Sequence, residues 1–232
     1  MKRNIVLFAT ICLLGANVFS QECSTYFPVE TGTIIETTNY DKKDNVTGKT
    51  VHTYKDRQTS GDTVIYTVQV NSYDKNDELL FSREMKFKCY QDKLYFDLQN
   101  YLDPNTMEAY KEMEIEIESD NLVLPAGLQA GQELNDGSMK ISITGSGLPS
   151  GINMNIDITN RKVETTENMT TPAGDFECAK VTYDMDMKMT FIKTHTQGKE
   201  WWAENVGVVR SETYNKKGKL MGYSVISKIT KP

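Results

Sequence analysis

The stretch from Gly198 to Lys231, GKEWWAENVGVVRSETYNKKGKLMGYSVISKITK, decides the fold class. It contains one strand through Trp201 and Trp202, followed by two more strands that are joined by the pentapeptide YNKKG. In this pentapeptide, Asn215 can accept hydrogen bonds across the turn, and Gly218 can take the left-handed conformation of a type I turn followed by a bulge. The stretch therefore predicts an antiparallel meander.

The same turn pattern occurs twice more, as YDKKD at residues 40–44 and as YDKND at residues 73–77. Each copy has an aromatic residue, Asp or Asn, Lys, a polar residue, and then Asp or Gly, with an aliphatic residue two positions later. The copies are irregularly spaced, which excludes a solenoid or a propeller. The pattern predicts three hairpins of one kind, with their lysines solvated at the tips.

Most of the remaining chain alternates between apolar and polar residues, as in KEMEIEIES (111–119) and INMNIDITN (152–160). This period of two is typical of strands with one buried face. The single helix signal is LDPNTMEAY, in which Asp103 would cap a short helix that begins at Pro104. A chain of strands joined by short turns hides its edges as a barrel, a half-barrel or a sandwich.

Three segments carry a family resemblance: CSTYFPVETGT (23–33), TPAGDFECAKVTY (171–183) and WWAENVGVVRSETYNKKGKL (201–220). Together they resemble the TapB-like family of exported bacterial proteins. Folds of this kind are similar to the LolA and LolB lipoprotein carriers, whose half-barrel wraps an apolar cavity. The resemblance thus implies an all-β fold, a curved antiparallel meander that forms a half-barrel with one short helix. It supplies no catalytic or binding residues.

The first 20 residues are predicted to be a signal peptide. Two basic residues, Lys2 and Arg3, precede an apolar run, and Val18 and Ser20 are the small residues before a cleavage site. The mature chain would then be a single antiparallel β domain of residues 21–232.

The expected cellular location depends on whether a lipid anchor or a membrane-spanning segment follows the signal peptide. Neither Cys12 nor Cys23 is preceded by a small residue, so no lipid anchor is expected. No later apolar run is long enough to span a bilayer. We expect a protein of the periplasm or the exterior of a Gram-negative bacterium. The formal net charge of −6 argues against nucleic acid as a partner.

Three cysteines would remain after cleavage: Cys23, Cys89 and Cys178. An oxidising compartment allows one disulfide and leaves one thiol, so three pairings are open. We favour Cys23 with Cys89, because both lie at the edges of predicted elements. Cys178 lies inside the strand FECAKVTY, where it can serve as a small buried residue.

No catalytic or metal-binding motif is present in the sequence. The two histidines, His52 and His195, each stand alone in a strand, and HxxxH, CxxC, GxSxG and phosphate-binding loops are absent. A dyad of Cys178 and His195 is formally possible but has no identifiable orienting residue. Asp184 and Asp186 would suit a metal or a glycosidase pair, although the polar side of a strand explains them as well. The sequence predicts no enzyme, no metal and no cofactor.

The best candidate for a binding surface is an apolar stripe. The segment YDMDMKMTF (183–191) alternates, which places its methionines and its final phenylalanine on one side of a strand. Flexible methionines suit a wall that adapts to apolar ligands of different shapes. The residues of this predicted concave surface are Met185, Met187, Met189, Phe191, Ile156, Ile158 and Trp201. An ordinary closed core is the alternative explanation.

Two functions remain open: an exported protein that holds a lipid or another hydrophobic ligand, or a cell-envelope interaction or assembly protein, as in pilus assembly, without a small-molecule ligand. For the second function, Trp202 is the candidate contact with an envelope protein partner, because an exposed tryptophan flanked by Glu200 and Glu204 could stack on sugar or on protein. Thr63, in the tripeptide Asp-Thr-Val, is a candidate O-glycosylation site.

Overall fold

The structure is a computed structural model that describes residues 26–28, 30–101, 112–145, 151–189 and 192–232. The predicted signal peptide (1–20) and the predicted helix at 104–110 lie outside these residues. The described residues form one antiparallel sheet of 13 strands and one short 3₁₀ helix. The elements are β1 (Ile34–Asp41), β2 (Val46–Ser60), β3 (Thr63–Asp74), β4 (Leu79–Tyr90), β5 (Lys93–Asp97), η1 (Leu98–Tyr101), β6 (Glu114–Ser119), β7 (Asn121–Pro125), β8 (Gly137–Thr144), β9 (Ile152–Thr171), β10 (Gly174–Met189), β11 (Ile192–Ala203), β12 (Gly207–Asn215) and β13 (Leu220–Thr230).

The sheet curves until its two edges nearly meet. Its strand order is β6-β8-β9-β10-β11-β12-β13-β1-β2-β3-β4-β5-β7. Strands β6 and β7 therefore lie at opposite edges, although Asp120 is the single residue between them in the chain. One continuous segment thus pairs with β8 along its first half and with β5 along its second half. The predicted all-β half-barrel is confirmed.

The loop that follows β7 continues the wall on this side of the molecule. The backbone N–H of Leu134 donates to the carbonyl of Arg161 at 2.9 Å, and the N–H of Gly131 donates to the carbonyl of Val163 at 2.8 Å. These bonds attach the loop to β9, where the neighbouring strand satisfies its backbone groups. The loop therefore extends the wall beyond the end of β7.

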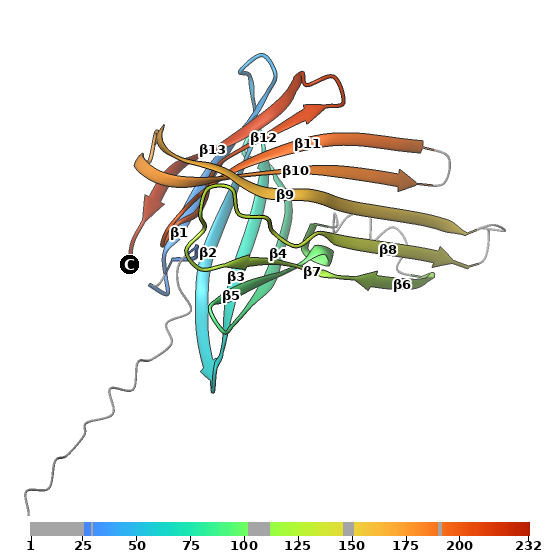
Figure 1. The fold of residues 1–232 in the computed structure, drawn as a ribbon, viewed down its shortest axis with the longest axis horizontal. Coiled ribbons are helices and arrows are strands. Elements are labelled where there is room, and N and C mark those ends of the chain that lie inside the picture. The colour runs from blue at the N-terminus through green and yellow to red at the C-terminus, as the bar shows by residue number, and fades with distance from the viewer. Residues whose placement is uncertain (1–25, 29, 102–111, 146–150, 190–191) are drawn as a thin grey trace, which may run out of the picture.

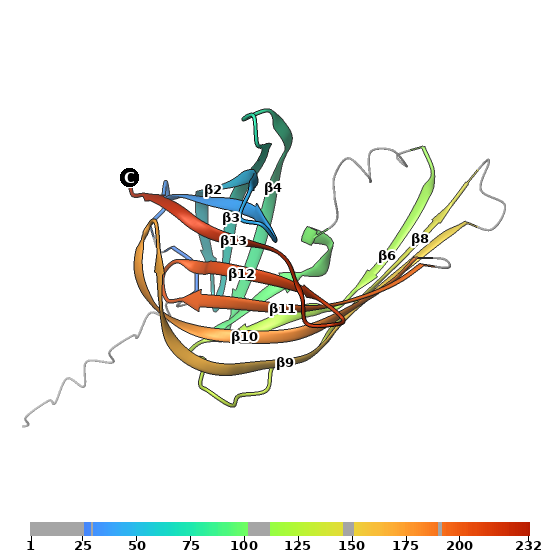
Figure 2. The same cartoon turned by 90° about the horizontal axis from the view of Figure 1, so that it is seen from above.

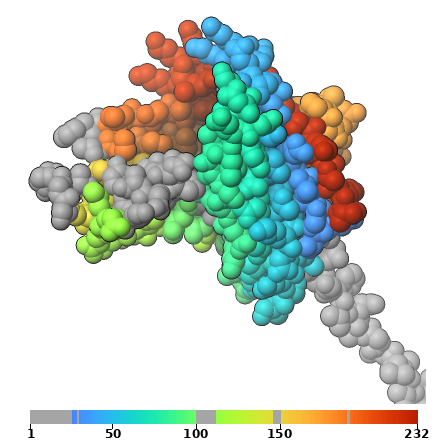
Figure 3. Space-filling view, turned by 180° about the vertical axis from the view of Figure 1, so that it is seen from behind, coloured from blue at the N-terminus to red at the C-terminus, as the bar shows by residue number. Residues whose placement is uncertain are grey.

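The figures show how the strands of the curved sheet are arranged in space. In Figures 1 and 2, strands β6 and β8 to β11 run out together on one side, whereas β2, β3 and β4 form a wing that crosses them steeply. Seen from behind in Figure 3, the green-teal strand β4 runs down the centre of the molecule, with the orange strands β10 and β11 on one side of it. The wing and the extended strands are therefore two arms of one sheet that run in different directions.

The three predicted hairpins share one turn structure. In the first hairpin, Asp41 Oδ1 accepts hydrogen bonds from the backbone N–H of Lys43 (2.7 Å) and of Asn45 (3.0 Å), and Asp74 and Asn215 make the equivalent bonds in the other two. The bulge residues Asp44, Asp77 and Gly218 have φ values of 62°, 65° and 69°. The hairpins β12–β13, β1–β2 and β3–β4 are consecutive in the sheet, so their three tips lie at one end of it.

Candidate functional site

The concave face of the sheet lines two adjoining, partly open cavities of about 210 and 280 Å³. Phe96, Glu200 and Trp202 line both of them. The walls are mainly apolar in each cavity. The site therefore consists of two apolar cavities, with the carboxylate of Glu200 in the wall between them.

Strands β9 and β10 supply one wall of the larger cavity. Met185 pairs with Ile158, and Met187 pairs with Ile156, directly across these two strands. All four side chains line the cavity, together with Leu122 and other apolar residues. The alternation of the sequence thus placed these methionines and isoleucines on one common face, as predicted.

Two further members of the predicted stripe do not line this cavity. Met189 is 40% exposed and lies at the end of β10, beyond the enclosed part of the interior. Phe191 lies outside the described residues.

Neither tryptophan has the surroundings that the sequence predicted. Trp202 is only 7% exposed and lines both cavities, so it cannot present its ring to a partner protein. Trp201 packs instead in a second cluster with Cys178 and Ala203, and its indole lies under the Lys180 ammonium at 5.4 Å. Their placement was wrong because neighbouring strand residues point to opposite faces, and here both faces bury a tryptophan.

Glu200 is the charged group at the centre of the site. One of its carboxylate oxygens accepts a hydrogen bond from Trp202 Nε1 at 2.9 Å, and the other accepts one from the Tyr183 hydroxyl at 3.2 Å. Burial raises the pKa of this carboxyl group, while the Trp202 N–H, the charge of Arg161 and the Tyr183 hydroxyl act in the opposite direction. The acid is thus held by two donors and one buried cation inside an apolar wall.

Aromatic rings fill much of the space around the smaller cavity. Phe27 packs against Tyr54, Phe87 and Phe96 with ring centroids 5.6, 4.8 and 6.3 Å apart. Its neighbour Tyr26 packs edge-on against Trp202. The short segment 26–28 therefore reaches into the end of the half-barrel. Sequence reasoning missed these rings, because their partners lie far apart in the chain.

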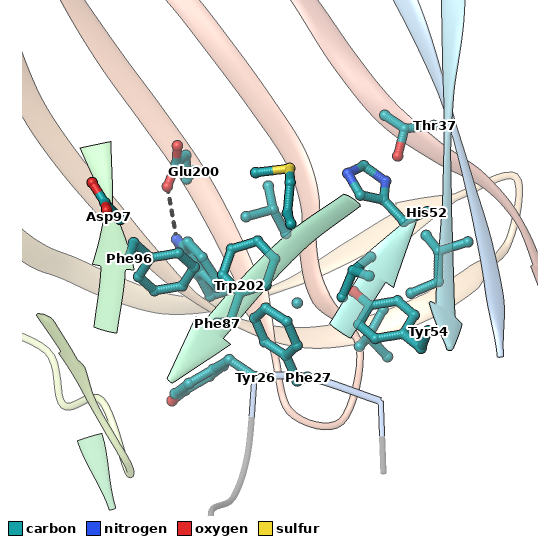
Figure 4. A pocket seen from close by; sticks show the side chains of 16 residues that line it. Tyr26, Phe27, Thr37, His52, Tyr54, Phe87, Phe96, Asp97, Glu200 and Trp202 are labelled. Carbon is teal, nitrogen blue, oxygen red and sulfur yellow. Dashed lines mark hydrogen bonds between the residues drawn. The ribbon is translucent and has the colours of Figure 1, made fainter. Parts of the chain in front are cut away.

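Polar side chains occupy the far end of the smaller cavity. Thr37 on β1, and His52 and Tyr54 on β2, line it. Burial lowers the pKa of His52 to about 4 and raises the pKa of Tyr54, so both are neutral at pH 7. In Figure 4, Thr37 and His52 lie on one side of the cavity, Glu200 and Asp97 on the other, and the labelled aromatic rings between them.

The comparisons with known proteins agree with this architecture. A family model described as DUF3108-like matches residues 30–226. The chain belongs to the DUF3108-like family. The resemblance to the TapB-like family is not confirmed, and no protein with a curated description matches this DUF3108-like chain.

Two crystal structures resemble this DUF3108-like protein. One, from Bacteroides fragilis, is described as an exported protein with a YmcC-like fold; it is 25% identical with a TM-score of 0.73. The other, from Parabacteroides distasonis, is described as a lipoprotein; it is 24% identical with a TM-score of 0.74. Each match covers 90% of this chain and 100% of the other. The second likeness shows the fold alone.

The cysteines of this family member occupy different environments. Cys178 is free and buried, whereas Cys89 is disulfide-bonded. Cys23 lies outside the described residues, so its pairing with Cys89 stays a prediction. Burial raises the pKa of the Cys178 thiol to about 11, and the charges of Glu167 and Glu177 add to this effect. A thiol in this state is a poor nucleophile.

The remaining candidate residues of the DUF3108-like chain lie away from the cavities. His195 pairs with Asp186 on the far part of β10 and β11, whereas Cys178 pairs with Ala203 at the other end, so no dyad forms. His195 Nδ1 lies 2.9 Å from Asp186 Oδ1 on the surface. Across the described ranges, no group of three or more His, Cys, Asp or Glu residues could hold a metal ion.

Two further observations concern modification and membranes. Thr63 begins β3 and is half-buried, next to the exposed Gly61 and Asp62 of the preceding turn. O-glycosylation of Thr63 stays a prediction.

In the part of the DUF3108-like chain that the structure covers, no helix is long and apolar enough to cross a bilayer.

Proposed function

We propose that this protein is an exported, non-catalytic binding protein that holds a lipid or another apolar small molecule inside its half-barrel. The observation that carries the proposal is the pair of adjoining apolar cavities of about 210 and 280 Å³. Each is smaller than the roughly 300–1,000 Å³ of a typical ligand site, but the two together fall within that range. The side chains of Phe96 and Trp202 lie between the two cavities, and a rotation of these rings would join the cavities into one.

The composition of the walls supports a ligand of variable shape. Met185 and Met187 are half-buried rather than fully packed, and Met85 lines the smaller cavity. Methionine side chains have three rotatable bonds and a polarisable sulfur, so they adjust to different apolar surfaces. An acyl chain fits this chemistry.

The non-catalytic part of the proposal has its own support. Cys178 has a raised pKa and lies far from His195 along β10 and β11. Glu200 is already bonded to Trp202 and Tyr183. The export part draws on the predicted signal peptide and on the similar structure from Bacteroides fragilis, which is described as an exported protein. A periplasmic location would follow.

The experiment that tests the proposal combines a ligand search with a matched pair of variants. Native mass spectrometry of protein purified from its own host is expected to show a bound small molecule. Pyrene, a hydrocarbon without polar atoms, serves as the binding probe in vitro. Met187→Asp places a charge in the larger cavity, whereas Met189→Asp places the same charge on the same face of β10 at a 40% exposed position.

The expected result is a loss of pyrene affinity of about tenfold or more in Met187→Asp, because the carboxylate brings water into the apolar cavity. Met189→Asp should bind pyrene as the wild type does. If no small molecule accompanies the native protein and the wild type does not bind pyrene, the proposal is wrong.

A second function has one observation in its favour. Val46, Leu79, Leu80 and Met221 are large apolar residues with exposures of 47%, 56%, 53% and 49%, and they lie at the three hairpin tips on one end of the sheet. Such a patch suits an envelope protein partner. This alternative predicts that an envelope protein co-purifies with the wild type and with Met187→Asp, but not with a Leu79→Ser, Leu80→Ser double variant.

A further inference from the structure

Three polar side chains in the smaller cavity have no hydrogen-bond partner among the residues that the structure describes. They are the hydroxyl of Thr37, the imidazole of His52 and the hydroxyl of Tyr54. Ile35 pairs with His52 across β1 and β2, which places Thr37 diagonally beside the imidazole. All three residues are half-buried and line the cavity, so their polar groups remain available to a bound ligand.

The two carboxylates of the same cavity already have donors. Asp97 Oδ1 accepts hydrogen bonds from the backbone N–H of Gln99 (2.9 Å) and from the Ser119 hydroxyl (2.9 Å). Glu200 accepts from Trp202 and Tyr183 and lies near the charge of Arg161. The polar side chains of this cavity that have no hydrogen-bond partner among the described residues are therefore the uncharged side chains of Thr37, His52 and Tyr54.

The charges around the smaller cavity disfavour an anionic ligand group. Among the described residues that line it, two are acidic and none is Lys or Arg. A carboxylate or phosphate here would be buried beside like charges with no cation to pair with, which is strongly unfavourable. A neutral histidine, a tyrosine hydroxyl and a threonine hydroxyl can instead donate to and accept from an uncharged oxygen.

We propose that the Thr37, His52 and Tyr54 end of the smaller cavity binds an uncharged oxygen-bearing group, such as a hydroxyl or an ester carbonyl, at one end of an otherwise apolar ligand. This inference rests on the proposed function, because it names the class of ligand for the same interior. The ligand chain would extend past Phe96 and Trp202 toward Met185 and Met187, since both cavities share those two rings.

The test compares ligands that share one chain and differ in the polar group. Displacement of pyrene at pH 7.5 is measured for 1-dodecanol, methyl dodecanoate, dodecanoate and dodecylamine. The alcohol and the ester are expected to bind about tenfold or more tightly than the carboxylate, because only the charged group must be buried without a counter-ion. The amine is expected to bind no better than the alcohol, since both acids already have donors.

A matched pair of variants assigns the effect to this end of the cavity. Tyr54→Phe removes one hydroxyl and keeps the ring, so it should weaken 1-dodecanol binding about fivefold more than pyrene binding, because pyrene has no polar atom for that hydroxyl to bond. Tyr40→Phe is the control, since the Tyr40 ring stacks on Tyr223 at 4.8 Å and does not line the cavity. Thr37→Val tests the neighbouring hydroxyl if Tyr54→Phe fails to fold.

The outcomes separate this inference from the proposed function. Pyrene binding accompanied by equal or tighter binding of dodecanoate, or by tighter binding of dodecylamine, overturns the inference and leaves the apolar-ligand function intact. The same holds if Tyr54→Phe and Thr37→Val leave 1-dodecanol binding unchanged. Failure of the wild type to bind pyrene and all four ligands overturns both.

Discussion

Trp202 donates its indole N–H to Glu200 across two positions of β11, with 2.9 Å between Nε1 and Oε2. The adjacent Trp201 donates its N–H to a different carboxylate, Glu167 Oε1 on β9, and lies beneath Lys180 and Arg210. The two neighbouring rings thus have separate partners on opposite faces of one strand. They are also the two tryptophans of the whole chain.

Tryptophan fluorescence should therefore distinguish the two faces. In a Trp201→Phe variant, the remaining Trp202 lines both cavities, so its emission should change when a non-absorbing alkyl ligand such as 1-dodecanol binds. In a Trp202→Phe variant, the remaining Trp201 lines neither cavity and its emission should not change. An emission change in the second variant alone would contradict the placement of the two rings.

A second prediction concerns Gly198, which pairs with Tyr183 across β10 and β11. A Cβ at this position would overlap the Tyr183 ring. Gly198→Ala should lower the free energy of unfolding by about 1–3 kcal/mol, because the ring must leave its place beside Glu200. Urea denaturation measures the change. In a Tyr183→Ala background the same substitution should cost much less, and an equal cost in both backgrounds would show that the ring is not the reason.

A third prediction concerns pH. Burial lowers the pKa of His52 from 6.5 to about 4, so the folded state prefers the neutral imidazole. Between these two values the unfolded chain binds more protons, and the free energy of unfolding must fall as the pH falls. The contribution of His52 is present above pH 6.5 and declines by up to about 3 kcal/mol toward pH 4.

The control for this titration is His52→Leu, which cannot bind a proton. Chemical denaturation at several pH values between 4 and 7 should give a smaller loss of stability for the variant than for the wild type. Glu200 has a raised pKa, which acts in the opposite direction, and it is present in both proteins. Parallel pH profiles would mean that His52 does not set the slope.

A fourth prediction is that Cys23 is the disulfide partner of Cys89. The closed loop of about 65 residues would stabilise the folded state by roughly 4 kcal/mol in the chain-entropy model. Peptide mapping without reduction should recover the linked pair, and Cys178 should react with a thiol reagent only after unfolding, since it is 1% exposed. Reduction should destabilise the wild type and a Cys178→Ala variant equally. Three free thiols, or a link to Cys178, would disprove the pairing.

Local patterns in the sequence predicted much of the fold. The YNKKG turn contains both the Asx acceptor and the left-handed residue that its hairpin needs, so Asn215 and Gly218 could be assigned without knowledge of the neighbours. The alternation around Met185 and Met187 likewise fixed a common face, because the period of a strand does not depend on distant contacts.

The candidate site was less predictable, because its polar end reverses the usual pattern. On β2, the polar residues His52 and Tyr54 line the smaller cavity, while the apolar Val51 that precedes them belongs to the other face of the strand. Periodicity of hydrophobic residues therefore gave no sign of this wall. The closing of the sheet at Asp120 was equally hidden, since it depends on which strands pair across the whole chain.

That single residue between β6 and β7 is also a joint between the two edges of the half-barrel. The backbone N–H of Asp120 donates to the carbonyl of Ser138 at 2.9 Å, and the Ser138 hydroxyl donates to Asp120 Oδ2 at 2.8 Å, so β8 fixes the bend in two ways. A rotation about the backbone of Asp120 that changed the angle between the two edges would have to break these two bonds to Ser138. The two edges are joined a second time where the loop after β7 bonds to β9 and where Arg161 Nη1 donates to the carbonyl of Val123 on β7. The girth of the half-barrel therefore depends on the geometry of both joints.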